Sequence, residues 1–322
     1  MKNFQIDKAI GGYFFFETNQ SSEYHTQALR LNLARSAVEY ILTAGVFSSV
    51  YIPKWCCDSL WAPVKRMNTP IHWYNIDEHF MPVNISPCKG DLVIIINFYG
   101  LINSKLQDKL AQEYPYLLID NSQAFFSLPQ QAASTVYSAR KFFGVPDGAY
   151  LYTNYRLSSP LDTDSSYRRF EYLFKRLDLG ASEAYEDFKH NEEVLSKDGM
   201  KRMSKSTRAV LNGIDYKRVK MQREKNWAFL DKNLKGMNNL KKAMPPGPMC
   251  YPFMCENGND ARRFLIGKKI YVPIYWKDAL IRLSPTDLEY SYVNDILPLP
   301  IDQRYTNEDM RTIVQCLEGY FG

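Results

Sequence analysis

The chain has 322 residues, a net charge of +5, and apolar and charged shares of 45% and 23%. This length is enough for one large domain and a smaller one, with a sizeable core. The mild positive charge permits an anionic ligand but does not indicate nucleic acid as a partner. The longest apolar run, residues 92–96, has only the length of a strand, so the sequence predicts no membrane span.

The cysteines and the N-terminus favour a cytoplasmic protein. Six cysteines are spread along the chain without the regular spacing of a disulfide framework, so we expect reduced thiols. The first residues are polar and lack the apolar centre of a signal peptide. The four histidines are not spaced as a metal pair, and no metal site is predicted.

The first half of the chain alternates strand-like and helical segments. Apolar residues at helical spacing predict a helix over residues 32–44, and further helices are expected at 60–66 and 105–112. Strands are predicted at residues 50–53, 71–77, 92–98, 116–120, 135–138 and 149–153. Strands separated by helices imply a mainly parallel sheet that helices cover on both faces. Ligands bind beyond the carboxyl ends of such strands, so the residues just after each strand are the candidates.

The last third of the chain predicts a separate α+β lobe. Residues 165–195 are charged and helical, residues 203–240 predict one or two long helices, and Pro245 marks a break. Strands are then expected at residues 251–254, 269–274 and 296–301, before a final helix from Asn307. We therefore expect a large domain over residues 1–202 and a smaller domain over residues 203–322.

Two residues at predicted strand ends suggest a cofactor site. Asp120 ends one strand, where a carboxylate most simply caps the following helix. Lys141 follows another strand and lies between Arg140 and two phenylalanines, before a turn that ends at Gly148. Most single lysines are surface charges, but apolar rings and a neighbouring cation favour a neutral, nucleophilic amine. An electron-sink cofactor needs both a lysine, for a Schiff base, and a carboxylate that keeps its pyridine nitrogen protonated.

These segments resemble the DegT/DnrJ/EryC1/StrS family, the sugar aminotransferases of fold type I that use pyridoxal phosphate. The resembling segments are residues 31–37, 51–57, 97–100, 119–124 and 138–149, with looser matches at 203–207 and 297–301. The resemblance covers most of the chain and is most specific around Lys141. It implies an α/β fold with a mainly parallel sheet covered by helices and a smaller C-terminal α+β lobe. It also implies a homodimer.

The resemblance assigns roles around the pyridine ring. Lys141 corresponds to the Schiff-base lysine, and Asp120 to the partner of the pyridine nitrogen. Gln123 matches a polar residue near the phenolic oxygen of the cofactor. Trp55 falls where an aromatic side chain stacks on the pyridine ring, although an aromatic residue of the core or the surface explains it equally well.

The phosphate-binding turn of the family corresponds to the start of the first predicted helix. Arg35 and Ser36 occupy this turn, and Ser138 is expected to add a hydroxyl group to the same phosphate. The Gly-Thr pair of the family is replaced by Ala34-Arg35-Ser36. A helix N-terminus still offers free N–H groups to an anion, and an arginine suits a phosphate.

The implied reaction is the transfer of an amino group from an amino acid, with glutamate expected, to a keto-sugar. The sugar is expected to be nucleotide-linked and destined for a surface polysaccharide or a related glycan. Two alternatives remain open. One is a pyridoxal-phosphate enzyme of another reaction type; dehydrating relatives carry a histidine in place of Lys141, which argues against that type. The other is a regulatory member of the fold that has lost its chemistry.

Residues 201–225 form a basic stretch with few acidic residues. A solvated helix face explains such a stretch most simply. Attraction of a nucleotide-sugar diphosphate is the second reading, and nucleic acid the third. We expect small-molecule substrates, and neither nucleic acid nor a membrane as a partner.

Overall fold

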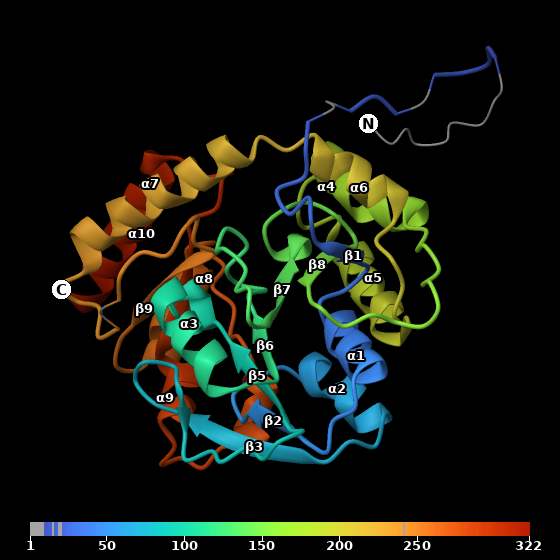
Figure 1. The fold of residues 1–322 in the computed structure, drawn as a ribbon. Helices are drawn as coiled ribbons and strands as arrows, with labels where there is room; N and C mark the ends of the chain where they lie inside the picture. Colours follow the sequence, from blue (N-terminus) through green and yellow to red (C-terminus); the bar gives the residue numbers. More distant parts are fainter. Residues whose placement is uncertain (1–9, 15, 19–20, 241) are drawn as a thin grey trace.

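A computed structural model of the chain describes residues 10–14, 16–18, 21–240 and 242–322. Its centre is an 8-stranded sheet with the strand order β1-β8-β7-β6-β5-β2-β3-β4 (Figure 1). The strands are β1 (Leu29–Leu31), β2 (Val50–Pro53), β3 (Ile71–Ile76), β4 (Pro82–Val83), β5 (Leu92–Ile96), β6 (Leu117–Asp120), β7 (Ser134–Ser138) and β8 (Ala149–Tyr152). The pairings among β3, β2, β5, β6 and β7 are parallel, and those of β1, β8 and β4 are antiparallel. The predicted mainly parallel sheet is confirmed.

Helices cover this sheet on both faces. The side chains of β5 are buried along its whole length, as expected of a strand between two helical layers. In Figure 1, α3 (Ser104–Glu113) lies to the left of the sheet, and α1 (Arg35–Ala44) and α2 (Asp58–Arg66) lie to its right. Helix α1 forms because Ala37, Val38 and Ile41 make one buried apolar face.

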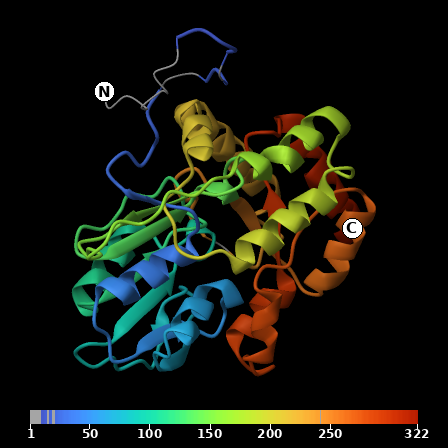
Figure 2. The ribbon, with the colours of Figure 1, turned by 90° about the vertical axis from the view of Figure 1, so that its right-hand side faces the viewer.

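The remaining elements form a helical region beside the sheet and a smaller lobe. Beside the sheet lie α4 (Glu171–Leu179), α5 (Tyr185–Lys197) and α6 (Lys205–Asn212). The smaller lobe contains α7 (Tyr216–Leu234), β9 (Cys250–Met254), α8 (Gly258–Gly267), α9 (Leu288–Asp295), β10 (Ile296–Pro300) and α10 (Asn307–Phe321). Short 3-10 turns are η1 (Phe98–Gly100), η2 (Ala139–Lys141), η3 (Tyr167–Phe170) and η4 (Lys277–Ile281). Figure 2 shows the sheet on the left and this lobe on the right.

The core consists of two buried clusters, which do not follow the lobe boundary. The larger one contains the strands of the large sheet together with residues of the smaller lobe such as Leu240, Tyr292 and Ile296, and the second lies between residues 227 and 317. In the second cluster Trp227, Phe253, Leu299 and Ile313 pack α7 and α10 against the β9–β10 pair. Met203 and Leu211 still belong to the first cluster, so the domain boundary at residues 202 and 203 stays a prediction.

The structure corrects one predicted strand and adds others. Residues 269–274 are irregular, because the N–H groups of Lys269 and Ile270 bond back to Ile266 and Leu265 and end α8. Pro273 also lacks the N–H that a ladder needs. The short edge strands β1 and β4 and the helices α8 and α9 were not predicted. The other predicted strands and helices are confirmed within a few residues.

A buried histidine fastens the N-terminal segment to the sheet. The Nε2 of His25 donates to the carbonyl oxygen of Phe125 at 2.9 Å, and its Nδ1 accepts from the hydroxyl of Tyr152 at 3.2 Å. The ring lies 4.1 Å from that of Tyr137. Burial lowers the pKa of His25 to about 4, so the imidazole is neutral in the folded chain at neutral pH.

We therefore predict that stability falls as the pH drops below 6.5. The unfolded chain protonates His25 near pH 6.5, whereas the folded chain resists protonation down to about pH 4. This group contributes its full stability above pH 6.5 and loses about 3 kcal/mol of it between pH 6.5 and 4. Urea unfolding across this range should show the loss, and His25→Gln should flatten it. The exposed-site variant His72→Gln should keep it; an unchanged slope in His25→Gln would contradict the prediction.

Candidate active site

The carboxyl ends of β5, β6 and β7 meet at one edge of the sheet. The strand register places Ile96 beside Asp120, and Asp120 beside Val136. Asn97 follows β5, and its amide donates to the side-chain oxygen of Asn121 at 2.8 Å. Parallel pairing thus collects polar side chains from three strand ends at a single edge, as is usual for ligand sites in such sheets.

Asp120 and Gln123 lie in the turn that follows β6. Oδ1 of Asp120 accepts from the backbone N–H of Ser122 at 2.8 Å, so the carboxylate does cap its own turn. Oδ2 has no hydrogen bond or ion pair with another described residue. Gln123 is buried, and its Oε1 accepts from the backbone N–H of Tyr99 at 2.7 Å. That bond holds Tyr99 in the left-handed region, at a φ of 56°.

Lys141 ends η2, directly after β7. Its side chain is exposed and has no hydrogen bond or ion pair with another described residue. The turn is closed by the backbone N–H groups of Phe142 and Phe143, which both donate to the carbonyl oxygen of Ala139. Because the phenyl rings of both residues are buried in the core, the backbone of the turn is anchored while the lysine points outward.

The start of α1 lies beside the lysine loop. The backbone N–H of Gly148 donates to the carbonyl oxygen of Asn32, which joins the two segments. Arg35 opens α1 and has no hydrogen bond or ion pair with another described residue. Ser36 is buried, and its hydroxyl donates to Asn32 Oδ1 at 2.8 Å. Ser138 is buried at the end of β7, paired with Ala149 of β8.

Arginines give this region its charge. Burial lowers the pKa of Arg140, and the positive charge of Arg35 acts in the same direction. Burial likewise lowers the pKa of Arg35. Arg140 forms an ion pair with Glu192, but its Nε is buried without a hydrogen-bond partner. Partly desolvated guanidinium groups beside a helix N-terminus suit an anion such as a phosphate.

Trp55, predicted to stack on the pyridine ring of the cofactor, lies in the core. The side chain is fully buried, and its ring stacks on Phe98 at 4.5 Å with an angle of 10° between the planes. Trp276 and Tyr292 cover its other sides. The alternative reading as a core aromatic therefore has direct contacts to support it, and stacking on a cofactor stays a prediction.

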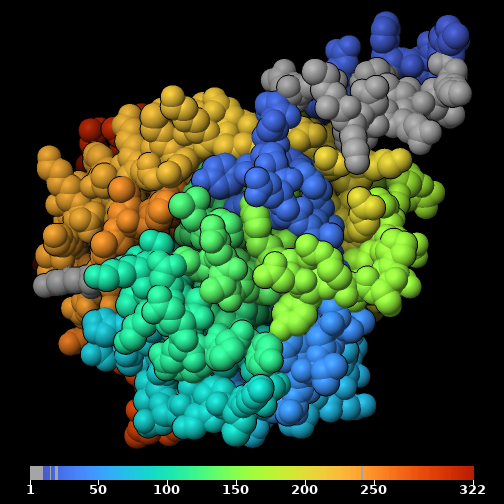
Figure 3. Space-filling view, viewed as in Figure 1, coloured from blue at the N-terminus to red at the C-terminus, as the bar shows by residue number. Residues whose placement is uncertain are grey.

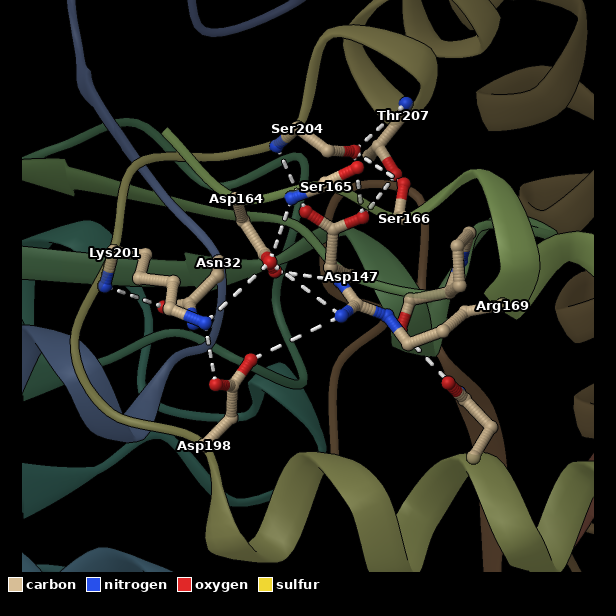
Figure 4. Close-up of polar contacts among 12 residues, drawn as sticks. Asn32, Asp147, Asp164, Ser165, Ser166, Arg169, Asp198, Lys201, Ser204 and Thr207 are labelled. Carbon is tan, nitrogen blue, oxygen red and sulfur yellow. Dashed lines mark hydrogen bonds and ion pairs between the residues drawn. The ribbon is translucent and has the colours of Figure 1, made fainter. Parts of the chain in front are cut away.

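Sequence reasoning assigned no role to Asp147, which connects the lysine loop to α6 (Figure 4). Its carboxylate is fully buried and accepts from the backbone N–H and the hydroxyl of Ser204, at 3.0 and 2.9 Å, and from the hydroxyl of Thr207. Next to it, Gly148 has a φ of 122°, and a Cβ there would lie 3.1 Å from Thr207. The signal in the sequence was an acid just before this glycine, together with the Ser-x-x-Thr of the looser family match.

A second polar cluster holds residues 198–202, the segment that precedes α6, in place. Arg169 donates to Asp164 at 2.5 Å, and Lys201 to Asp198 at 2.6 Å (Figure 4). The amide of Asn32 donates to the carbonyl oxygen of Gly199 at 2.9 Å. Residues 198–202 are thereby fixed against the start of α1.

Solved structures of known proteins share the fold of this chain. No protein-family profile and no curated protein matches the sequence. Solved structures do match. A DegT DnrJ EryC1 StrS aminotransferase from Brucella abortus has 15% identity and a TM-score of 0.62, covering 92% of this chain and 86% of that one. DesI, solved with its TDP-sugar product, has 12% identity and a TM-score of 0.62, with coverages of 90% and 79%.

A third match is Spr1654 from Streptococcus pneumoniae in its PMP-form, with 14% identity and a TM-score of 0.61; it covers 91% of this chain and 88% of that one. The chain therefore has the fold of the DegT/DnrJ/EryC1/StrS sugar aminotransferases. The resemblance seen in the sequence is confirmed at the level of the fold.

The described residues fit pyridoxal phosphate chemically. The cofactor requires an amine without a partner, a carboxylate oxygen for the pyridine nitrogen, and positive groups for the phosphate. Lys141, the Oδ2 of Asp120 and the guanidinium of Arg35, which has no partner among the described residues, meet these requirements at one edge of the sheet.

Neither a membrane-spanning helix nor a cluster of metal-ligating side chains occurs among the described residues. They contain no helix that is long and apolar enough to cross a membrane. They also contain no group of three or more His, Cys, Asp and Glu side chains placed to hold a metal ion.

We predict that the Asp147 network stabilises the folded chain strongly. Thr207→Val removes one of the three donors to a buried carboxylate and should cost about 1.5–3 kcal/mol in urea unfolding. The matched control is Thr43→Val, whose hydroxyl donates to a helix carbonyl on an exposed face. It should change stability by less than about 0.5 kcal/mol. Equal losses in the two variants would argue against the network.

Proposed function

We propose that this protein is an aminotransferase that uses pyridoxal phosphate. The observation that carries the proposal is the exposed, unpaired amine of Lys141 at the same sheet edge as the Asp120 carboxylate. When bound, the cofactor supplies an electron sink for the bond that breaks at the α carbon of an amino acid. The fold shared with known sugar aminotransferases supports this choice among cofactors.

The residues of the chain take distinct roles in the proposal. Lys141 would hold the cofactor through its Nζ, and the same Nζ would move the proton of the donor's α carbon. Asp120 Oδ2 would accept the hydrogen of the protonated pyridine nitrogen, and Gln123 would be the polar residue near the phenolic oxygen. The phosphate is bound by Arg35, Ser36 and Ser138. The hydroxyl of Ser36 donates to Asn32 and its backbone N–H donates to the carbonyl oxygen of Leu33 at 3.1 Å, so the guanidinium of Arg35 is the donor at the helix start without a partner among the described residues.

The substrates are an amino donor, with glutamate expected, and a keto-sugar that is linked to a nucleotide. DesI, a protein of the same fold that was solved in the presence of its TDP-sugar product, supports a nucleotide-linked acceptor. A place in polysaccharide or glycan synthesis and a cytoplasmic location belong to the same proposal. All six cysteines are unpaired, as expected of reduced thiols.

Borohydride reduction with pyridoxal phosphate tests the central assignment. The purified chain should show a visible absorbance band with the cofactor, and reduction should fix the label on Lys141, as mapped by mass spectrometry. Lys141→Ala should lose the label, whereas Lys109→Ala, on the exposed face of α3, should keep it. Glutamate should then shift the band as the cofactor takes up the amino group. A label on another lysine would refute the assignment.

The same experiment separates the two alternatives. A labelled Lys141 whose absorbance band does not respond to glutamate or to any other amino acid would favour the regulatory reading. A band that responds to an amino acid without formation of the pyridoxamine form would favour another reaction type.

We further propose that the chain forms a homodimer through the α4–α5 hairpin. Helix α4 has no buried residue, and Phe174, Leu177 and Leu179 are exposed on it. On α5, which packs beside α4, Tyr185 and Phe188 are also exposed; Figure 2 shows the two helices. Exposed apolar side chains gathered on one hairpin indicate an interaction site. The described part of the N-terminal arm, residues 10–14, is also apolar and stands out from the body in Figure 3.

We expect Leu177→Glu to weaken this dimer. Leu177 is 81% exposed, so a charge there costs the single chain little but places a desolvated carboxylate within the proposed interface. Sedimentation velocity should show a larger monomer fraction than in the parent chain. The control is Tyr271→Glu in the smaller lobe, also strongly exposed and outside the hairpin, which should leave the mass unchanged. A monomeric parent chain, or an unaffected dimer in Leu177→Glu, would refute the proposal.

A further inference from the structure

Arg223 differs from the rest of the basic stretch in which it lies. A solvated helix face was predicted for residues 201–225, but Arg223 on α7 is only 2% exposed, so that reading is wrong for this residue. Burial lowers the pKa of Arg223 to about 10. The structure shows no ion pair between Arg223 and a carboxylate of the described residues. A buried cation without a carboxylate is costly, so its hydrogen bonds need an explanation.

Those hydrogen bonds join the smaller lobe to the lysine turn. Nε of Arg223 donates to Gln303 Oε1 at 2.8 Å, and Nη1 donates to the carbonyl oxygens of Pro248 and Met249, at 3.0 and 3.2 Å. Nη2 donates to the carbonyl oxygen of Phe142 at 3.3 Å. The centre of the guanidinium lies 4.6 Å from the centroid of the Phe142 ring.

Gln303 reinforces the same contact. Its Nε2 donates to the Phe142 carbonyl oxygen at 2.8 Å, so this single oxygen accepts two hydrogen bonds from the smaller lobe. Phe142 is the residue directly after Lys141. Its N–H is meanwhile bonded to Ala139 within the large domain, at 3.0 Å. The backbone that carries Lys141 is therefore held from both lobes, within one residue of the lysine.

We propose that Arg223 is a positioning residue that, with Gln303, sets the direction in which Lys141 presents its amine. The proposal rests on the proposed function and deepens it. Because both donors belong to the smaller lobe, a movement of that lobe shifts the Phe142 carbonyl and with it the lysine. The lysine is thereby coupled to the position of the smaller lobe without any contact between Arg223 and the cofactor.

The test compares two cofactor forms. Pyridoxal phosphate binds through Lys141, whereas pyridoxamine phosphate carries an amine where the aldehyde stands and cannot form that link. Arg223→Met should reduce the apparent affinity for pyridoxal phosphate about tenfold, the size of one lost hydrogen bond to a charged group. Its affinity for pyridoxamine phosphate should stay within about twofold, as measured by fluorescence titration.

Two further variants keep the test sharp. Arg262 is also a buried arginine of the smaller lobe that donates to carbonyl oxygens, those of Asn294 and Ile296, away from the lysine turn. Arg262→Met therefore matches the loss of packing and should change neither affinity by more than about twofold. If Arg223→Met does not fold, Gln303→Met is used in its place. Gln303 is half-buried, and its loss should produce the same selective loss of affinity for pyridoxal phosphate.

The outcomes separate this proposal from the proposed function. Equal losses for the two cofactor forms, or the same selective loss in Arg262→Met, would overturn the positioning role. A parent chain that forms no borohydride-stable link would overturn the proposed function instead. The rate at which an acylating reagent labels Lys141 in the chain without cofactor would then decide the positioning role. A change of about tenfold in Arg223→Met or Gln303→Met, and none in Arg262→Met, supports it, and equal rates overturn it.

Discussion

The parallel pairing of β5, β6 and β7 is the constraint on which the candidate site depends. Parallel strands end at the same edge of a sheet, so Asn97, Asp120 and Ser138 are brought together although 41 positions separate the first from the last. Strand β5 is buried on both faces, and this keeps the edge in place. The turns that follow the strands lie outside the sheet, so hydrogen bonds from other segments of the chain have to hold their backbone.

The lysine turn shows how that support is supplied. On one side, Asp147 receives hydrogen bonds from the start of α6, and Tyr172 and Asn191 of the α4–α5 hairpin donate to the carbonyl oxygens of Val145 and Pro146. On the other side, Arg223 holds the carbonyl of Phe142 from the smaller lobe. Segments far apart in the sequence thus position one short loop, while the amine of Lys141 stays unpaired among the described residues.

Three arginines lie around the lysine turn. Around this loop Arg223 is buried and Arg35 and Arg140 are partly buried, and burial lowers the pKa of each. A desolvated cation interacts more strongly with an anion than a solvated one does. Arg35 and Arg140 suit a phosphate, whereas every hydrogen bond of Arg223 goes to a neutral acceptor of the chain. The three arginines therefore differ in their contacts with the described residues, and only those of Arg223 hold the backbone.

The sequence by itself determined the layered α/β fold, the strands of the large sheet other than the edge strands β1 and β4, and the candidates Lys141 and Asp120. These follow from local periodicity and from strand ends, which depend on neighbouring residues. The strand predicted at residues 269–274 failed because a helix end, formed by bonds back to α8, overrides strand-like composition there. The role predicted for Trp55 stays a prediction. Its ring contacts Phe98, Trp276 and Tyr292, which come from other segments of the chain, and a local sequence pattern does not reveal such contacts.

Only the tertiary structure decided how the lysine turn is held. Asp147 meets Thr207 across 60 positions, and Arg223 meets Phe142 across 81. No local pattern distinguishes the buried Arg223 from the exposed cations beside it, because burial depends on how α7 packs against the rest of the chain. Local sequence thus places Lys141 and Asp120 at the sheet edge. Long-range packing determined which arginine side chains are buried and which backbone carbonyl oxygens accept their hydrogen bonds.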